Sequence, residues 1–186
     1  VERIAPDCAA ARALIAAGTR REACLWTSDG THRTVSPAPG GAPLLACEDA
    51  PLRFMRRHDP ARRLIVSGGD PGALALAQLG AMAGFETLLV RPAGPQGPPP
   101  LPGVTYRREE PAALLASIGV DRWTAYVGAT HEDHEDLGAC LHALRHGAGY
   151  VGMIGARSRA AGRIAALAKA GATDAELARL HLSPGI

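Results

Sequence analysis

Aromatic residues are scarce in this sequence. They make up 4% of its 186 residues, so a hydrophobic core must be built mainly from Ala, Leu, Val and Ile. No apolar run approaches the roughly 18 residues that suggest a membrane span, and the first residues lack the basic and then apolar pattern of a signal peptide. The formal net charge of +2 does not indicate a nucleic-acid surface. These absences predict a cytoplasmic protein that binds neither membranes nor nucleic acid.

Cysteine pairs with the spacing of metal ligands are also missing. The four cysteines, Cys8, Cys24, Cys47 and Cys140, stand far apart, and the sequence contains no C-x-x-C. We therefore expect buried, reduced thiols of the kind found in cytosolic proteins.

The pattern of elements changes near residue 60. Residues 1–60 predict a small α+β region, with a helix at 8–17 capped by Asp7, strands at 23–27, 31–35 and 44–47, and a helix at 50–57. Across residues 61–186, apolar strands alternate with helices. The strands are expected at 64–67, 86–90, 104–107, 123–129 and 150–154, and the helices at 72–83, 111–118, 133–146, 158–170 and 174–180. This alternation predicts an α/β fold, a Rossmann-like doubly wound parallel sheet, with binding sites at the carboxyl ends of its strands.

The turn at 67–72, with the sequence SGGDPG, lies where a dinucleotide-binding fold has its glycine-rich turn. Small residues let a pyrophosphate approach the backbone, but Asp70 would oppose it by charge and bulk. Arg91 ends the second strand, where an acid would hold the ribose of NAD; an arginine could instead meet the 2′-phosphate of NADP. The interpretations left open are a phosphorylated pterin, NADP, and a tight turn without a nucleotide, with NAD fitting less well. The binding residues predicted here are Gly68, Gly69, Asp70, Gly72 and Arg91.

A second turn, at 130–136, gathers two histidines and four carboxylates in the sequence THEDHED. His131 and His134 are three residues apart, so on a helix they would share a face, as metal ligands can. The alternative is a helix start capped by Thr130 or Asp133, with acids that complement the helix dipole. A zinc site would need a further His or Cys, which the sequence does not identify, and no metal site is predicted.

A third turn, at 152–159, again places glycine at the start of a helix. Backbone N–H groups at Gly155 and the guanidinium of Arg157 predict an anion site, and Arg163 lies further along the helix. The alternative is a solvated basic face.

These turns resemble those of the XdhC/CoxI family, maturation factors of molybdenum hydroxylases such as xanthine dehydrogenase. The resemblance covers about residues 62–186 and rests on the Thr-His turn at 130, YVGMIGAR at 150–157 and ELARLH at 176–181. It implies a Rossmann-like domain that binds molybdenum cofactor, protects it and passes it to an apo-hydroxylase, as a chaperone rather than an enzyme. Thr130 and His131 would face the ligand, and the glycine turns with Arg157 would meet its phosphate.

The sequence departs from this family in its first 60 residues, which lack the Ser-Gly-Gly-Cys turn of full-length members. The partners that the resemblance implies are the apo-hydroxylase and a cysteine desulfurase, with a homodimer as a further expectation.

Two other functions stay open. One is an NAD(P)-dependent oxidoreductase in which His131 donates a proton; the other is an interaction module of the same fold that has lost its ligand.

Overall fold

The computed structural model describes residues 4–130 and 133–182. The chain forms two units, Val1–Ala61 and Arg62–Ile186. Each unit has its own sheet, and the second carries the candidate site.

The first unit consists of helix α1 (Ala9–Thr19) and a four-stranded antiparallel sheet in the order β2-β1-β4-β3. Its strands are β1 (Cys24–Ser28), β2 (Arg33–Pro37), β3 (Leu45–Asp49) and β4 (Leu52–His58). Strands β1 and β2 form a hairpin around Asp29 and Gly30, a pair that favours such turns. Oδ1 of Asp29 accepts hydrogen bonds from the backbone N–H groups of Thr31 and His32, at 2.8 and 2.6 Å, and Gly30 adopts a φ of 91°.

Two predictions for this unit are wrong. The helix expected at 50–57 is strand β4, which pairs with β1 on one side and β3 on the other. Two ladders of backbone hydrogen bonds stabilise the strand, whereas a helix of eight residues is marginal by itself. In addition, α1 begins after Cys8 rather than with an Asp7 cap, and continues past Gly18 to Thr19.

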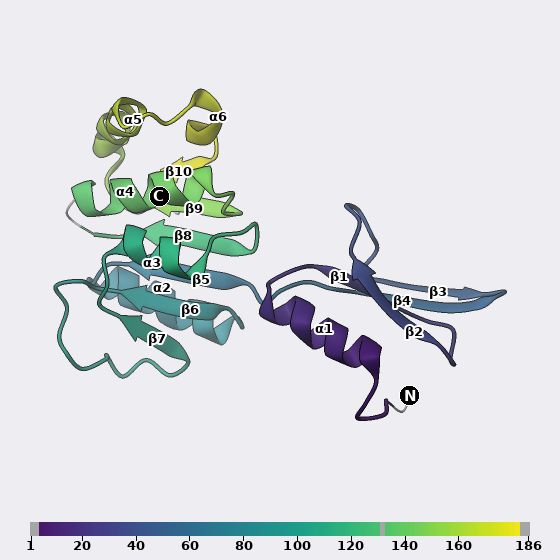
Figure 1. Ribbon diagram of the computed structural model, residues 1–186. Coiled ribbons are helices and arrows are strands. Elements are labelled where there is room, and N and C mark those ends of the chain that lie inside the picture. The colour runs from purple at the N-terminus through teal and green to yellow at the C-terminus, as the bar shows by residue number, and fades with distance from the viewer. Residues whose placement is uncertain (1–3, 131–132, 183–186) are drawn as a thin grey trace. The chain divides into compact units, whose positions relative to one another are not determined.

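The second unit contains a parallel sheet in the order β10-β9-β8-β5-β6-β7, stacked from top to bottom in Figure 1. The strands are β5 (Arg63–Ser67), β6 (Glu86–Val90), β7 (Val104–Arg107), β8 (Thr124–Gly128), β9 (Tyr150–Met153) and β10 (Leu180–Leu182). Numbered along this unit, the order is 6-5-4-1-2-3, the arrangement of a Rossmann fold. The predicted fold class is therefore confirmed. The last helix expected from the sequence ends earlier, at Leu177, and residues 180–182 form the edge strand β10 instead, paired with β9.

Helices cover both faces of this sheet. Helix α2 (Pro71–Met82) packs on one face, where Ala73 and Ala77 join Val66, Leu89 and Val127 in a buried cluster. The other face is covered by α3 (Pro111–Ile118), α4 (Asp133–Arg145) and α5 (Ala160–Lys169). The proline-rich segment between β6 and β7 contains no helix, as predicted. Successive strands are added in one direction from β5 to β7 and in the opposite direction from β8 to β10, so the strand order reverses between β5 and β8. At this switch point a ligand is expected near the carboxyl ends of the strands.

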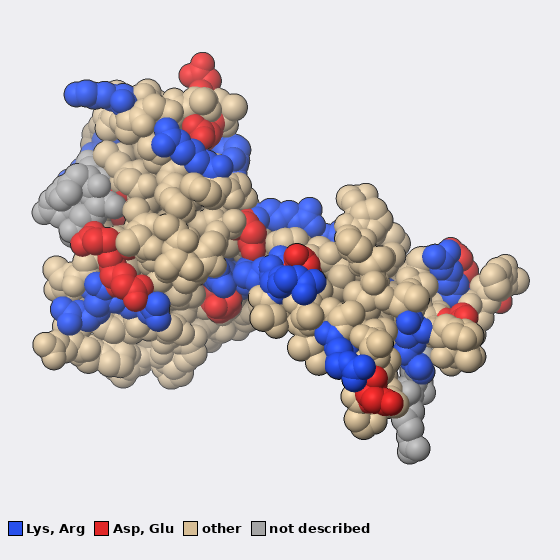
Figure 2. Space-filling view, in the orientation of Figure 1, with Lys and Arg blue, Asp and Glu red and all other residues tan. Residues whose placement is uncertain are grey.

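The face shown in Figure 2 gives little indication of a patch of one charge sign among the described residues. Basic and acidic side chains are interspersed over the described residues in the view of Figure 2. Among the helices of the described ranges, none has the length and apolar character needed to cross a bilayer.

Candidate functional site

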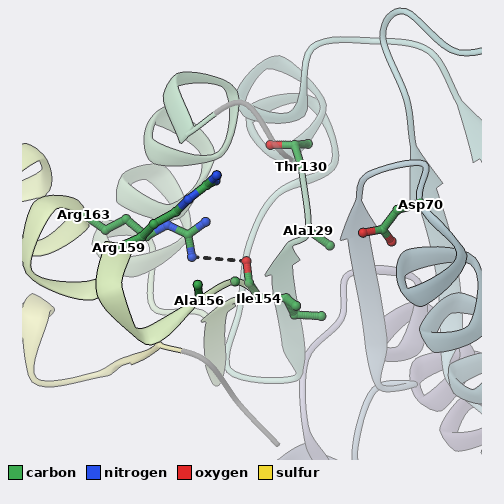
Figure 3. A pocket seen from close by; sticks show the side chains of 8 residues that line it. Asp70, Ala129, Thr130, Ile154, Ala156, Arg159 and Arg163 are labelled. Atoms are coloured by element: carbon green, nitrogen blue, oxygen red, sulfur yellow. Dashed lines mark hydrogen bonds between the residues drawn. The ribbon is translucent and has the colours of Figure 1, made fainter. Parts of the chain in front are cut away.

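A cavity of about 200 Å³ opens where the carboxyl ends of β5, β8 and β9 meet. Its described lining comes from the segments that follow these three strands: Asp70, Ala129, Thr130, Ile154, Gly155, Ala156, Arg159 and Arg163. In Figure 3, Arg159 and Arg163 lie on one side of the cavity and Asp70 on the opposite side. The cavity thus lies at the switch point of the fold and has walls of opposite charge.

The basic wall depends on a close packing between an arginine and a glycine. Arg163 is only 3% exposed, and its Nη1 donates a hydrogen bond to the backbone oxygen of Ile154 at 3.1 Å. A Cβ at Gly155 would lie 2.8 Å from both terminal nitrogens of this guanidinium. Gly155 also adopts a φ of 154°. Glycine is therefore required here so that the buried guanidinium of Arg163 can lie against the backbone beside the cavity.

The acidic wall belongs to the start of α2. Asp70 is the N-cap of this helix, and its Oδ1 accepts a hydrogen bond from the backbone N–H of Ala73 at 2.7 Å. In dinucleotide-binding folds this helix start faces the pyrophosphate. Here a carboxylate of the chain itself occupies the anion position, which disfavours a pyrophosphate at the same place.

Arg91 closes this turn further. A Cβ at Gly69 would lie 2.5 Å from both Nε and Nη2 of Arg91, so the guanidinium packs directly on the Gly69 backbone. The structure thus brings the predicted residues Gly69 and Arg91 together, but the arginine covers the turn with its charged end.

The loop after β8 is fixed by a buried acid. Asp136 is fully buried, and its Oδ2 accepts hydrogen bonds from the backbone N–H and the hydroxyl of Thr130, at 3.0 and 2.7 Å. Its Oδ1 accepts a third from the hydroxyl of Tyr126 at 3.2 Å. Burial raises the pKa of Asp136 above its ordinary value, and the two hydrogen bonds from Thr130 partly offset this effect. Thr130 therefore serves as a hydrogen-bond partner of Asp136.

Glycine is also needed at the end of β8. A Cβ at Gly128 would lie 2.6 Å from Cγ of Asp136, inside van der Waals contact. The missing side chain makes room for the carboxyl group under the loop.

Three of the predicted site residues, Asp70, Thr130 and Gly155, line the cavity together. Gly68 lies just beside it, because a Cβ there would come within 2.6 Å of the Ala129 oxygen. Gly72 follows in the first turn of α2. His131 lies outside the described residues. The side chains of Asp133 and His134, on which the metal and cap alternatives also depend, are not described either.

Arg157 does not line the cavity. It is exposed in the short 3₁₀ helix η1 (Arg157–Arg159), and the arginines at the cavity are instead Arg159 and Arg163. Their spacing of four residues after a glycine turn places both on one side of a helical segment, a signal that could have identified them. No comparable signal distinguishes Asp136 from the other carboxylates of the 130–136 turn.

Comparison with known families agrees with this geometry. The model of the XdhC Rossmann domain matches residues 64–186. The chain belongs to the XdhC Rossmann-domain family. A comparison with curated proteins finds no match.

Among solved structures, this XdhC-family chain is similar to a crystal structure described as a xanthine dehydrogenase from Bacillus halodurans. The two share 16% sequence identity with a TM-score of 0.62, over 83% of this chain and 54% of the other. This chain thus spans about half the length of that protein. At such low identity the likeness shows the fold alone.

Proposed function

We propose that this chain is an accessory protein for the maturation of molybdenum hydroxylases such as xanthine dehydrogenase, with molybdenum cofactor as its cargo. The observation that supports this most is the position of a cavity with two arginines at the switch point of an XdhC Rossmann domain. Maturation would require the chain to hold the cofactor and release it to an apo-hydroxylase, without chemistry of its own.

The residues of the cavity suit a phosphorylated pterin. Arg159 and Arg163 form the basic wall, and arginine recognises phosphate oxygens through several N–H donors held in a fixed plane. Gly155 lets the guanidinium of Arg163 pack against the backbone beside the cavity. In this assignment the phosphate lies at the β9 side of the cavity, and Thr130, held by Asp136, borders it on the β8 side.

The geometry favours the pterin over a dinucleotide. Asp70 occupies the helix start that a pyrophosphate would need, and Arg91 packs on Gly69. A cavity of about 200 Å³, below the roughly 300–1,000 Å³ of most ligand pockets, also suits the smaller pterin monophosphate better than a dinucleotide. NADP remains the rival ligand because Arg91 lies at the turn, and an oxidoreductase would follow from its binding.

The proposal includes its partners and place of action. The apo-hydroxylase is the expected client, a cysteine desulfurase is the expected source of the sulfur that the cofactor carries, and the chain would act in the cytoplasm, as a homodimer. Capture of a purified apo-hydroxylase subunit by the purified chain, with and without molybdenum cofactor, tests the client directly.

The decisive experiment is an anaerobic titration of the purified chain with molybdenum cofactor, with NADH and NADPH in parallel. Arg159→Gln should weaken saturable cofactor binding by about 10-fold or more, because a charge-assisted hydrogen bond contributes roughly 1.5–3 kcal/mol. Arg157→Gln is the matched control, since this nearby arginine is exposed and outside the cavity lining. Binding of NADPH alone would replace the proposal with the oxidoreductase, and absence of binding by all three ligands would leave only an interaction module.

A further inference from the structure

Helix α2 has no charged side. Residues 71–85 include no ionisable side chain, and the side of the helix that carries Ala73 and Ala77 is buried against the sheet. On the other side, Leu79 is 61% exposed and Met82 is 75% exposed. A helix that is apolar on every side is normally buried on every side. The outer side of α2 therefore has the character of an interface.

The sheet face beside α2 is also incompletely covered. Helix α2 packs on β5, β6 and β7, and within the described ranges it is the only helix that contributes to the buried cluster on this face. Helices α3, α4 and α5 cover the opposite face. Ala125 on β8 and Tyr150 on β9 pack against the α2-face cluster and are half-buried. Since a helix is about as wide as two strands, a second helix fits on this half of the sheet beside α2.

A hollow of about 170 Å³ opens at the amino ends of the strands on this uncovered half. It is lined by Phe85, Ala125 and Tyr150, which pack against the α2-face cluster, and by Trp123. Three of these belong to the chain's seven Phe, Tyr and Trp residues. Arg122 also lines the hollow, and its guanidinium lies 4.3 Å from the centroid of the Trp123 ring. An aromatic, apolar centre with arginine beside it is the usual composition of a protein interface.

We propose that both surfaces are buried against a second copy of the chain, in a two-fold symmetric dimer in which α2 of each copy lies on the uncovered half of the other copy's sheet. One chain offers a helix side without a sheet and a half-sheet without a helix, so each copy supplies what the other lacks. The two helices lie side by side between two sheets, and neither brings a charge into the interface. This inference rests on the homodimer named in the proposed function and adds its interface; it does not depend on the cofactor.

The symmetry of such a dimer places Met82 opposite the hollow. Helix α2 begins at the carboxyl end of β5 and leads to the amino end of β6, so Met82, its last residue, lies at the sheet edge where the hollow opens. A two-fold interface brings the same patch of both copies together, and an axis parallel to α2 keeps the C-terminal ends of both helices at this edge. Met82 of one copy then enters the hollow of the other, and methionine fills irregular apolar spaces well.

Sedimentation equilibrium of the full chain tests this interface. Wild-type protein should form a dimer that dissociates on dilution. Leu79→Glu and Met82→Glu should each weaken dimerisation by about 100-fold or more, because a charge buried without a partner is strongly unfavourable. Both side chains are exposed in the single copy and glutamate is a good helix former, so each variant should fold, as circular dichroism can verify. Ile164→Glu is the matched control, since Ile164 is 43% exposed on α5, which covers the opposite face; it should leave the dimer unchanged.

A crosslink identifies the surface that α2 contacts. In a Cys47→Ser background, which removes the exposed thiol, chains with Met82→Cys are mixed with chains with Ala125→Cys and treated with a short bis-maleimide. This mixture should give a crosslinked dimer. A mixture of Ile164→Cys and Ala125→Cys chains should not.

The outcomes separate this inference from the rest of the proposed function. A chain that stays monomeric, a dimer that survives both glutamate variants, or absence of the mixed crosslink overturns the inference. A monomer that binds molybdenum cofactor would leave the cofactor proposal standing. A dimer that gives the mixed crosslink but binds no cofactor would support the inference and contradict the cofactor proposal.

Discussion

The hydroxyl of Thr130 donates to Oδ2 of Asp136 at 2.7 Å, and the backbone N–H of Thr130 donates to the same oxygen at 3.0 Å. One carboxyl group, buried in α4, therefore holds the residue that borders the cavity after β8. The stability of the sheet and the shape of the site depend on the same side chain.

Replacement of this acid should destabilise the protein measurably. Asp136→Ala removes the acceptor for Thr130 and leaves the buried hydroxyl of Tyr126 without its partner. An unsatisfied buried polar group costs about 1–3 kcal/mol. Urea unfolding should show a loss of that size in the free energy of unfolding. Thr130→Val removes only one hydroxyl and serves as the control; a loss as large as that of Asp136→Ala would contradict this assignment.

The same acid should give stability a characteristic pH dependence. Because burial raises the pKa of Asp136 above its ordinary value of 3.8, the folded chain holds this proton more tightly than the unfolded chain. Its contribution to stability is therefore fully present below that value and is lost as the pH rises through the raised, folded pKa. Relative to Asp136→Asn, which does not titrate, wild-type protein should lose free energy of unfolding over this interval. A difference that grows with pH instead would show that the hydrogen bonds from Thr130 outweigh burial.

Much of the second unit can be predicted from the sequence because its central strands are short apolar runs buried on both faces. All five residues of β5 are buried, and β6, β7 and α3 have the bounds that the pattern predicts. The edge strand β10 carries no such run. It forms because His181 and its neighbours pair with β9, a long-range contact that local pattern does not contain.

The site is harder to predict than the fold for a related reason. The sequence identifies the three turns, since glycine after an apolar run is a local signal. It does not show that Asp70 caps α2 or that Arg163 packs on Gly155, because both depend on side-chain geometry. The prediction of Arg157 as a site residue, when Arg159 and Arg163 line the cavity, has this origin.

The glycine at the end of β5 should be among the least replaceable residues of the site. Gly68 has a φ of 148°, and a Cβ there would lie 2.6 Å from the backbone oxygen of Ala129. Gly68→Ala should therefore cost about 2 kcal/mol or more in the free energy of unfolding, since backbone strain and a clash with backbone act together. Gly162→Ala in α5 is the opposite control. Apart from the adjacent residues and the helix's own backbone, no atom of the described residues lies within 4 Å of the methyl carbon added at Gly162. Alanine should therefore stabilise the helix by about 0.5–1 kcal/mol. If both variants unfold at the same urea concentration, the packing of Gly68 against Ala129 does not limit stability.

The cysteines should react in an order set by their burial. Cys24 and Cys140 are buried, Cys8 is half-buried and Cys47 is exposed on β3. The expectation of buried thiols is therefore confirmed for Cys24 and Cys140 and wrong for Cys47. Burial raises the pKa of Cys140 far above its ordinary value and that of Cys24 to a lesser degree, which reduces the reactive thiolate fraction of both. Native alkylation with iodoacetamide, followed by mass spectrometry, should modify Cys47 first and reach Cys140 only after denaturation in urea. A Cys47→Ser variant should then show little fast labelling. Labelling of Cys140 as fast as that of Cys47 without denaturant would mean that α4 separates from the sheet in the native state.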